Sequence, residues 1–180
     1  MILDLIDTLT EDQKELDQII ISKKGLNPKA NLDDKAVAIL VETGEFANEW
    51  RGFKFWSEKQ EPKDREKLIK ESVDCLHFFI SILNDMDLTD NDNPEVSGYE
   101  YLLEIYQCIH QPSLQAPKEL FKSLYKELSL FATNKSELRL IRALDVFDNL
   151  LRSLNISQEE VTEFYQGKNQ ENRERQDNGY

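Results

Sequence analysis

Acidic residues inside apolar helical sequence, between Leu40 and Leu83, are the feature that most restricts the folds open to this chain. Glu42, Glu45 and Glu49 occupy the first part of that segment. At about 100° per residue they fall in one narrow wedge of a helix whose remaining surface is mostly apolar. A helix on a protein surface shows a broad polar face instead. We therefore expect these three carboxylates to be at least partly enclosed.

A second apolar helix repeats the pattern. Glu71, Asp74 and His77 follow one another at three-residue spacing, and from Val73 onward this helix is apolar nearly all round. Burying several ionised carboxylates together costs many kcal/mol unless protons or cations neutralise them. Oxygen ligands without cysteine select a hard ion such as Mg²⁺ or Mn²⁺. The sequence therefore predicts a divalent-metal site whose ligands are Glu42, Glu45, Glu71 and Asp74.

The predicted metal site favours an anionic substrate. Mg²⁺ in proteins usually shares phosphate oxygens with a substrate, so the expected chemistry is metal-assisted hydrolysis of a phosphoanhydride. The formal net charge is -13 and no basic block occurs, which argues against stable nucleic-acid binding. Such a negative chain would repel an anionic substrate until metal had bound.

The composition predicts a single all-α domain. The 180 residues include only 6 Gly and 5 Pro, too few for a turn-rich sheet protein. We expect an all-α bundle of about six to seven helices over residues 1–180, with metal-site helices at about 31–83, a second helical half at about 95–166 and a tail at 165–180. The expected helices cover about 10–22, 31–51, 63–83, 97–109, 117–132, 136–154 and 157–166.

Three further segments are interpreted from their composition and spacing. Phe53, Phe55 and Trp56 either plug the bundle or form a lid or pocket wall. Asp145 and Asp148 are predicted to lie on a solvated or interface face. The tail at 165–180 has no apolar stripe, and its composition alone favours disorder.

The remaining features point to a reducing compartment. Cys75 and Cys108 stand in apolar helical context and are expected to be buried thiols rather than a disulfide. The N-terminal sequence has no basic region followed by a long apolar core, so it is not a secretory signal. No apolar run reaches about 18 residues, so no membrane span is predicted. A cytoplasmic location fits these observations.

Three motifs carry a resemblance to a known family. They are Glu42-Thr-Gly-Glu45, Trp50-Arg-Gly-Phe-Lys-Phe-Trp56 and Glu71-Ser-Val-Asp-Cys-Leu-His-Phe78. Together they resemble the dimeric all-α dUTPases of bacteria, phage and protists, which belong to the superfamily of all-α NTP pyrophosphatases (MazG-like). The tail, from Gly167 to Tyr180, is similar to the C-terminal phosphate-binding motif of that family.

The resemblance implies an activity and a set of roles. The reaction would be Mg²⁺-dependent hydrolysis of dUTP to dUMP and pyrophosphate, with dUDP as a second candidate substrate. It would keep uracil out of DNA and supply dUMP for thymidylate synthesis, and the enzyme would be a homodimer. Glu42, Glu45, Glu71 and Asp74 would bind the metal, and Glu42 or Glu45 would orient the attacking water.

The same resemblance implies the residues that bind substrate. Gln13, Asp17 and Trp56 would surround uracil, and His77 would approach the deoxyribose. Asp17 stands where some members of the family have Asn, and an ionised acid accepts hydrogen bonds without donating them. The residues that would hold the phosphates, with Tyr165 nearby, are Lys54, Lys168, Asn172 and Arg175.

Two other functions remain open from the sequence. The first is a house-cleaning nucleoside triphosphate pyrophosphatase of broader specificity. The second is a non-enzymatic helical interaction module with a vestigial site. Intact acid pairs combined with an intact tail motif argue against the second, because a scaffold needs neither.

Overall fold

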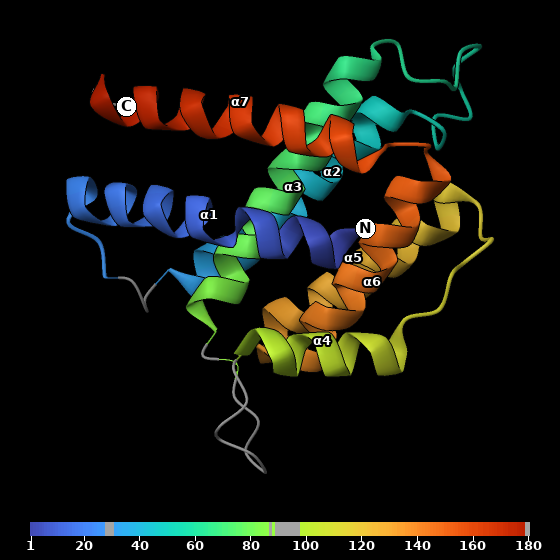
Figure 1. Cartoon of the computed structure of the whole chain (residues 1–180). Helices are drawn as coiled ribbons and strands as arrows, with labels where there is room; N and C mark the ends of the chain where they lie inside the picture. Colours follow the sequence, from blue (N-terminus) through green and yellow to red (C-terminus); the bar gives the residue numbers. More distant parts are fainter. Residues whose placement is uncertain (28–30, 87, 89–97, 179–180) are drawn as a thin grey trace.

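The chain folds into helices throughout the part that the structure describes. A computed structural model describes residues 1–27, 31–86, 88 and 98–178, and these residues form seven helices and no strand (Figure 1). The predicted all-α class is therefore confirmed. None of the helices is long and apolar enough to cross a membrane. Their bounds are α1 Ile2–Lys24, α2 Leu32–Trp50, α3 Arg65–Asp85, α4 Gly98–Ile109, α5 Pro117–Asn134, α6 Glu137–Ser153 and α7 Gln158–Asp177.

Two helix pairs and one crossing layer build the bundle. α2 packs along α3, and α5 packs along α6, while α1 and α7 lie side by side and both contact α3 (Figure 1). Buried aromatic rings connect the pairs: Phe147 of α6 lies 6.3 Å from Phe46 of α2 and 5.2 Å from Phe79 of α3, measured between ring centroids. These rings join α6 to both α2 and α3, and α3 in turn contacts α1 and α7.

The first helix starts earlier than predicted. Thr10, expected to begin it, lies inside α1 and donates its hydroxyl to the Ile6 carbonyl at 2.6 Å. Ile2, Leu5 and other apolar residues before it are buried, so core packing extends the helix toward the N-terminus. Its end lies close to the expected residue 22, because Gly25 adopts a left-handed conformation with φ 62° that ends the helix after Lys24.

The tail is helical where composition favoured disorder, and where the last helix was expected to end near residue 166. A capping box of Ser157 and Glu160 begins α7, close to the expected start at residue 157, and the helix then continues to Asp177. Polar contacts attach it to α1: Asn169 Nδ2 donates to the Asp12 carbonyl at 3.3 Å, and Arg173 pairs with Glu15 at 3.1 Å. Gly179 and Tyr180, the end of the predicted tail motif, lie outside the described residues.

The structure decides three smaller predictions. Cys108 is exposed, so its predicted burial is wrong, whereas Cys75 is buried as expected, and both thiols are free. Of the two interpretations of the aromatic segment, the plug is excluded, because Phe53, Phe55 and Trp56 are 38%, 82% and 66% exposed. On α6, Asp148 is buried rather than solvated, whereas the Asp145 side chain is 16% exposed.

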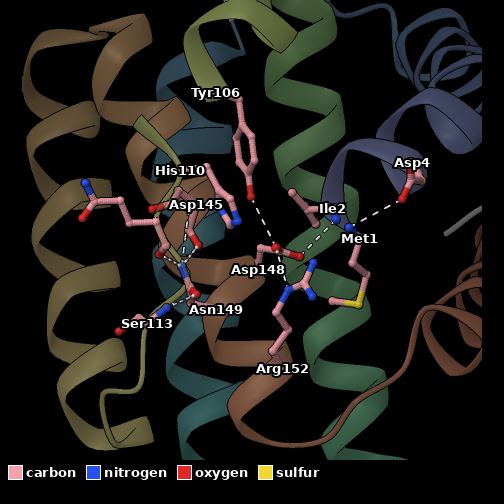
Figure 2. Close-up of polar contacts among 11 residues, drawn as sticks. Met1, Ile2, Asp4, Tyr106, His110, Ser113, Asp145, Asp148, Asn149 and Arg152 are labelled. Atoms are coloured by element: carbon pink, nitrogen blue, oxygen red, sulfur yellow. Dashed lines mark hydrogen bonds and ion pairs between the residues drawn. The ribbon is translucent and has the colours of Figure 1, made fainter. Parts of the chain in front are cut away.

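Asp148 is instead a buried junction between three helices. Its side chain is 1% exposed and accepts hydrogen bonds from the Ile2 backbone N–H at 3.0 Å and from the Tyr106 hydroxyl at 3.3 Å (Figure 2). Arg152 Nε, one turn later on α6, lies 3.0 Å from the same carboxylate. These contacts attach the start of α1 and helix α4 to α6.

Candidate active site

Three of the four predicted metal-binding acids converge. Glu42 and Glu45 lie one turn apart on α2, Glu71 lies on α3, and one carboxylate oxygen from each is within 4.8 Å of the other two. The geometry follows from local structure, because residues three apart share a helix face and α2 packs along α3. Three hard oxygen ligands from two rigid helices suit a divalent cation such as Mg²⁺ or Mn²⁺.

The fourth acid, Asp74, has a different partner in this structure. Its Oδ2 accepts a hydrogen bond from Lys168 Nζ of α7 at 2.8 Å. Both side chains are largely buried, at 17% and 24% exposed. The C-terminal helix therefore places a cation beside the acid cluster, next to one of its predicted ligands.

Glu42, Glu71 and Asp74 hold protons more strongly than usual, because their pKa values are raised. Burial, followed by the charges of Asp74, Glu45 and Glu71, raises the pKa of Glu42 to about 7. Burial is also the largest cause of the raised pKa values of Glu71 and Asp74. A bound divalent cation would relieve both causes, so the electrostatics of these residues fit a metal as well as their geometry does.

A cleft of about 340 Å³ opens beside the cluster. Its walls come from α1, α2, α3 and α7, which are the helices that carry the predicted site motifs. Glu42 lines the cleft, whereas Glu45 and Glu71 do not. The other predicted site residues that line it are Gln13, Asp17, Asp74, His77, Lys168, Asn172 and Arg175.

A buried polar network supports one end of this cleft. Gln13, 3% exposed, places its Oε1 2.7 Å from His77 Nδ1 and accepts the Tyr165 hydroxyl at 2.6 Å. The His77 ring stacks on Tyr165, with centroids 3.9 Å apart and 13° between the planes. Burial lowers the pKa of His77 to about 3, so the imidazole is neutral. Tyr165 therefore holds Gln13 and His77 from behind, and it does not line the cleft itself.

Two predicted substrate residues are not brought to the cleft. Lys54 and Trp56 lie in the loop after α2 and are not among the residues that line it. Lys54 Nζ donates to the Asn48 carbonyl and side-chain oxygens at 3.1 and 2.6 Å. The exposed Trp56 ring packs edge-on against Phe53 and Phe55.

The structure adds two cleft residues that the sequence interpretation missed. Lys35 and Ser81 line the cleft beside Asp17. Lys35 precedes Glu42 by two helical turns and so shares its face of α2, and Ser81 follows His77 by one turn on α3. That spacing was a usable signal, since a lysine on an acid-bearing core face needs a partner.

An all-helical chain whose neighbouring core helices bring carboxylates to one cleft has the layout of an all-α nucleotide hydrolase. A family model described as dUTPase matches residues 5–180, nearly the whole chain, and the chain belongs to this family. It is a dUTP diphosphatase, an enzyme that hydrolyses dUTP, as the motifs predicted. The family generally uses a divalent metal. A comparison with curated proteins gave no match.

Proposed function

We propose that this dUTP diphosphatase works with Mg²⁺, or Mn²⁺ in its place, held by Glu42, Glu45 and Glu71. The observation that carries the proposal is the approach of these three carboxylates to within 4.8 Å. When bound, the ion supplies charge stabilisation for the triphosphate and lowers the pKa of the attacking water. Asp74 becomes the fourth metal ligand once the hydrogen bond from Lys168 to its carboxylate is broken.

Glu42 is the better candidate of the two acids expected to orient the water. It lines the cleft, whereas Glu45 is exposed and outside the cleft lining. A carboxylate beside the reacting phosphate can accept the proton of the attacking water as a general base. Glu45 then serves mainly to hold the cation.

The substrate is proposed to lie along the cleft with its two ends on different helices. Gln13, Asp17 and His77 surround the nucleoside end. Lys168, Asn172 and Arg175 hold the phosphate end, and their spacing of four and three residues places them on one face of α7. The products are dUMP and pyrophosphate.

We further propose a homodimer, with Lys54 and Trp56 placed at the substrate site only in that assembly. Val37 and Val41 form an exposed apolar stripe on α2, and the exposed Phe55 and Trp56 follow α2 in the chain. Exposed apolar surface of this kind marks interaction sites. Light scattering after gel filtration is expected to give twice the mass of one chain, and Val41→Glu is expected to lower it. A wild-type monomer at all concentrations would exclude the dimer.

Residues 1–180 are proposed to act as one domain in a reducing, cytoplasmic setting. α3 contacts α1, α2 and α7, and α2 contacts α5 of the second helical half, so packing joins the parts. Cys75 and Cys108 are both free thiols, which fits such a compartment.

Lys168→Met is expected to move metal and substrate affinity in opposite directions. Removing the cation beside Asp74 frees a ligand and lessens repulsion, so Mg²⁺ or Mn²⁺ should bind several-fold tighter. The same change removes a phosphate contact, so KM for dUTP should rise about tenfold. Calorimetric metal titration and steady-state kinetics measure the two effects. Lys118→Met, at an exposed position on α5, is the matched control. Weaker binding of both the metal and dUTP by Lys168→Met would contradict the prediction that the two affinities move in opposite directions.

A substrate panel tests the proposed function. Pyrophosphate release is measured from equal concentrations of dUTP, dTTP, dCTP and UTP, with dUDP assayed separately by phosphate release. We expect Mg²⁺-dependent turnover that favours dUTP and that Glu71→Ala abolishes. Equal turnover of all four triphosphates would indicate the broader pyrophosphatase instead. Unchanged turnover in Glu71→Ala would show that the site assignment is wrong.

A further inference from the structure

A chain of buried polar contacts begins at Lys35 on α2. Lys35 Nζ lies 2.6 Å from Asp85 Oδ2 and 3.7 Å from Asp17 Oδ2, and all three side chains are 14% exposed. Ser81 Oγ donates to the same oxygen of Asp17 at 2.6 Å. The Ser81 hydroxyl thus donates to Asp17 and the Lys35 ammonium lies within ion-pair distance of it, so the Asp17 carboxylate acts as an acceptor toward both.

The accepting carboxylate of Asp17 determines how the amide of Gln13 is oriented. Gln13 Nε2 donates to Asp17 Oδ1 at 2.8 Å. The reverse orientation would place the amide oxygen against a carboxylate, where neither atom can donate. The Gln13 oxygen must therefore point the other way, toward His77 and Tyr165.

The oriented amide in turn determines which nitrogen of His77 carries the proton. Gln13 Oε1 accepts only, so the His77 Nδ1 that lies 2.7 Å away must be the protonated nitrogen. His77 Nε2 is then a lone-pair acceptor. It has no hydrogen-bond partner although the residue is only 6% exposed and lines the cleft. A buried acceptor left unsatisfied at a binding cleft indicates a ligand that donates to it.

We propose that Asp17, held by Lys35, acts as a positioning residue that fixes the amide of Gln13. The fixed amide keeps His77 in the Nδ1–H tautomer, and its Nε2 accepts a hydrogen bond from the nucleoside of the substrate. Asp17 thus acts on the substrate through two intervening side chains, in addition to lining the cleft itself.

The hydrogen bond from the nucleoside to His77 Nε2 rests on the proposed function. At neutral pH dUTP carries only two hydrogen-bond donors, the uracil N3–H and the 3′-hydroxyl. Either one satisfies the lone pair of His77 Nε2, and the Nε2–H tautomer would oppose the N3–H donor with a second donor. The tautomer is thus a determinant of nucleoside recognition at this cleft.

The tautomer can be measured in the free protein, without substrate or turnover. The chain contains 2 His, so ¹⁵N-labelled histidine gives two ring systems, and His110→Asn identifies the signals of His77. A long-range ¹⁵N–¹H correlation spectrum of the wild type is expected to show a protonated Nδ1 and an unprotonated Nε2. Asp17→Asn should shift His77 toward the Nε2–H tautomer, because the Gln13 amide is then free to turn. Lys35→Met keeps the Asp17 carboxylate in place and should shift the tautomer less.

A second aspartate, next to Lys35 in the chain, provides the control for these spectra. Asp34→Asn, an identical change at an exposed position beside Lys35, should leave the His77 signals unchanged. An Nε2–H tautomer in the wild type would overturn the proposal, as would a spectrum of Asp17→Asn identical to the wild type. Because no turnover is involved, failure of the proposed function would leave this test intact.

Two substrate analogues test the hydrogen bond from the nucleoside to His77 Nε2. One is 3-methyl-dUTP, which lacks the N3–H, and the other is 2′,3′-dideoxyuridine triphosphate, which lacks the 3′-hydroxyl. The wild type should bind one of them about tenfold more weakly than dUTP, and Asp17→Asn should lose that difference. Equal affinity of the wild type for dUTP and both analogues would show that the nucleoside does not use the acceptor.

Discussion

Glu42→Gln is expected to lower kcat for dUTP hydrolysis about a thousandfold while making the metal-free protein more stable at pH 8. The loss follows from removing a metal ligand that also lines the cleft as the candidate general base, a role usually contributing a factor of about 10²–10⁴. Initial rates of pyrophosphate release at saturating Mg²⁺ measure it. Glu163→Gln, at an exposed position on α7, is the matched control and should retain full activity.

The stability gain follows from the sign of the pKa shift. The pKa of Glu42 is raised from 4.5 to about 7 in the folded chain. The folded state therefore binds the proton more strongly than the unfolded state, so this group's contribution to stability falls as pH rises from about 4.5 to about 7. Glutamine removes that penalty. Because Glu42 is partly solvated, we expect a gain of about 1 kcal/mol at pH 8, or about 2–4 °C in Tm.

Thermal unfolding in chelator at pH 8 and at pH 5 tests this prediction. The Tm difference between Glu42→Gln and wild type should be positive at pH 8 and shrink toward pH 5, where Glu42 is already protonated. Added Mn²⁺ should reverse the order at pH 8, because only the wild type retains the full metal site. A variant less stable than wild type in chelator at pH 8 would show that the acids do not repel one another.

Asp148→Ala is expected to destabilise the fold by about 3–5 kcal/mol, because two buried donors lose their acceptor at about 1–3 kcal/mol each and Arg152, itself 52% exposed, loses its partner. The substitution leaves the Ile2 N–H and the Tyr106 hydroxyl without their acceptor and releases Arg152 (Figure 2). For a chain of this length the loss corresponds to a fall in Tm of about 10 °C.

Urea unfolding of the metal-free protein measures the Asp148→Ala effect directly. Asp34→Ala, the same change at an exposed site on α2, should cost less than about 0.5 kcal/mol. A loss below about 1 kcal/mol for Asp148→Ala would mean that the junction of α1, α4 and α6 does not depend on the carboxylate.

The parts of the fold and site that could be predicted from the sequence depend on local periodicity. Glu42, Glu45 and Glu71 were identified because acids at three-residue spacing stand out within apolar helices. The stop at Gly25 and the capping box at Ser157 are likewise local signals, and the structure contains both.

The errors arise where contacts between distant residues decide the outcome. The burial of Asp148 depends on Ile2, 146 residues away in the chain, and no neighbouring residue signals it. The helical tail is held by Asp12 and Glu15 of α1 rather than by an apolar stripe of its own. The role of Lys35 depends on Asp17 and Asp85, which come from two other helices.

Mn²⁺ binding, followed by electron paramagnetic resonance of the free ion, tests the central claim most directly. The account predicts that the wild-type protein removes Mn²⁺ from solution, that dUTP strengthens this uptake, and that Glu42→Gln combined with Glu71→Gln abolishes it while Glu163→Gln does not. Equal uptake by the wild type and the double variant, or no uptake by the wild type, would contradict it.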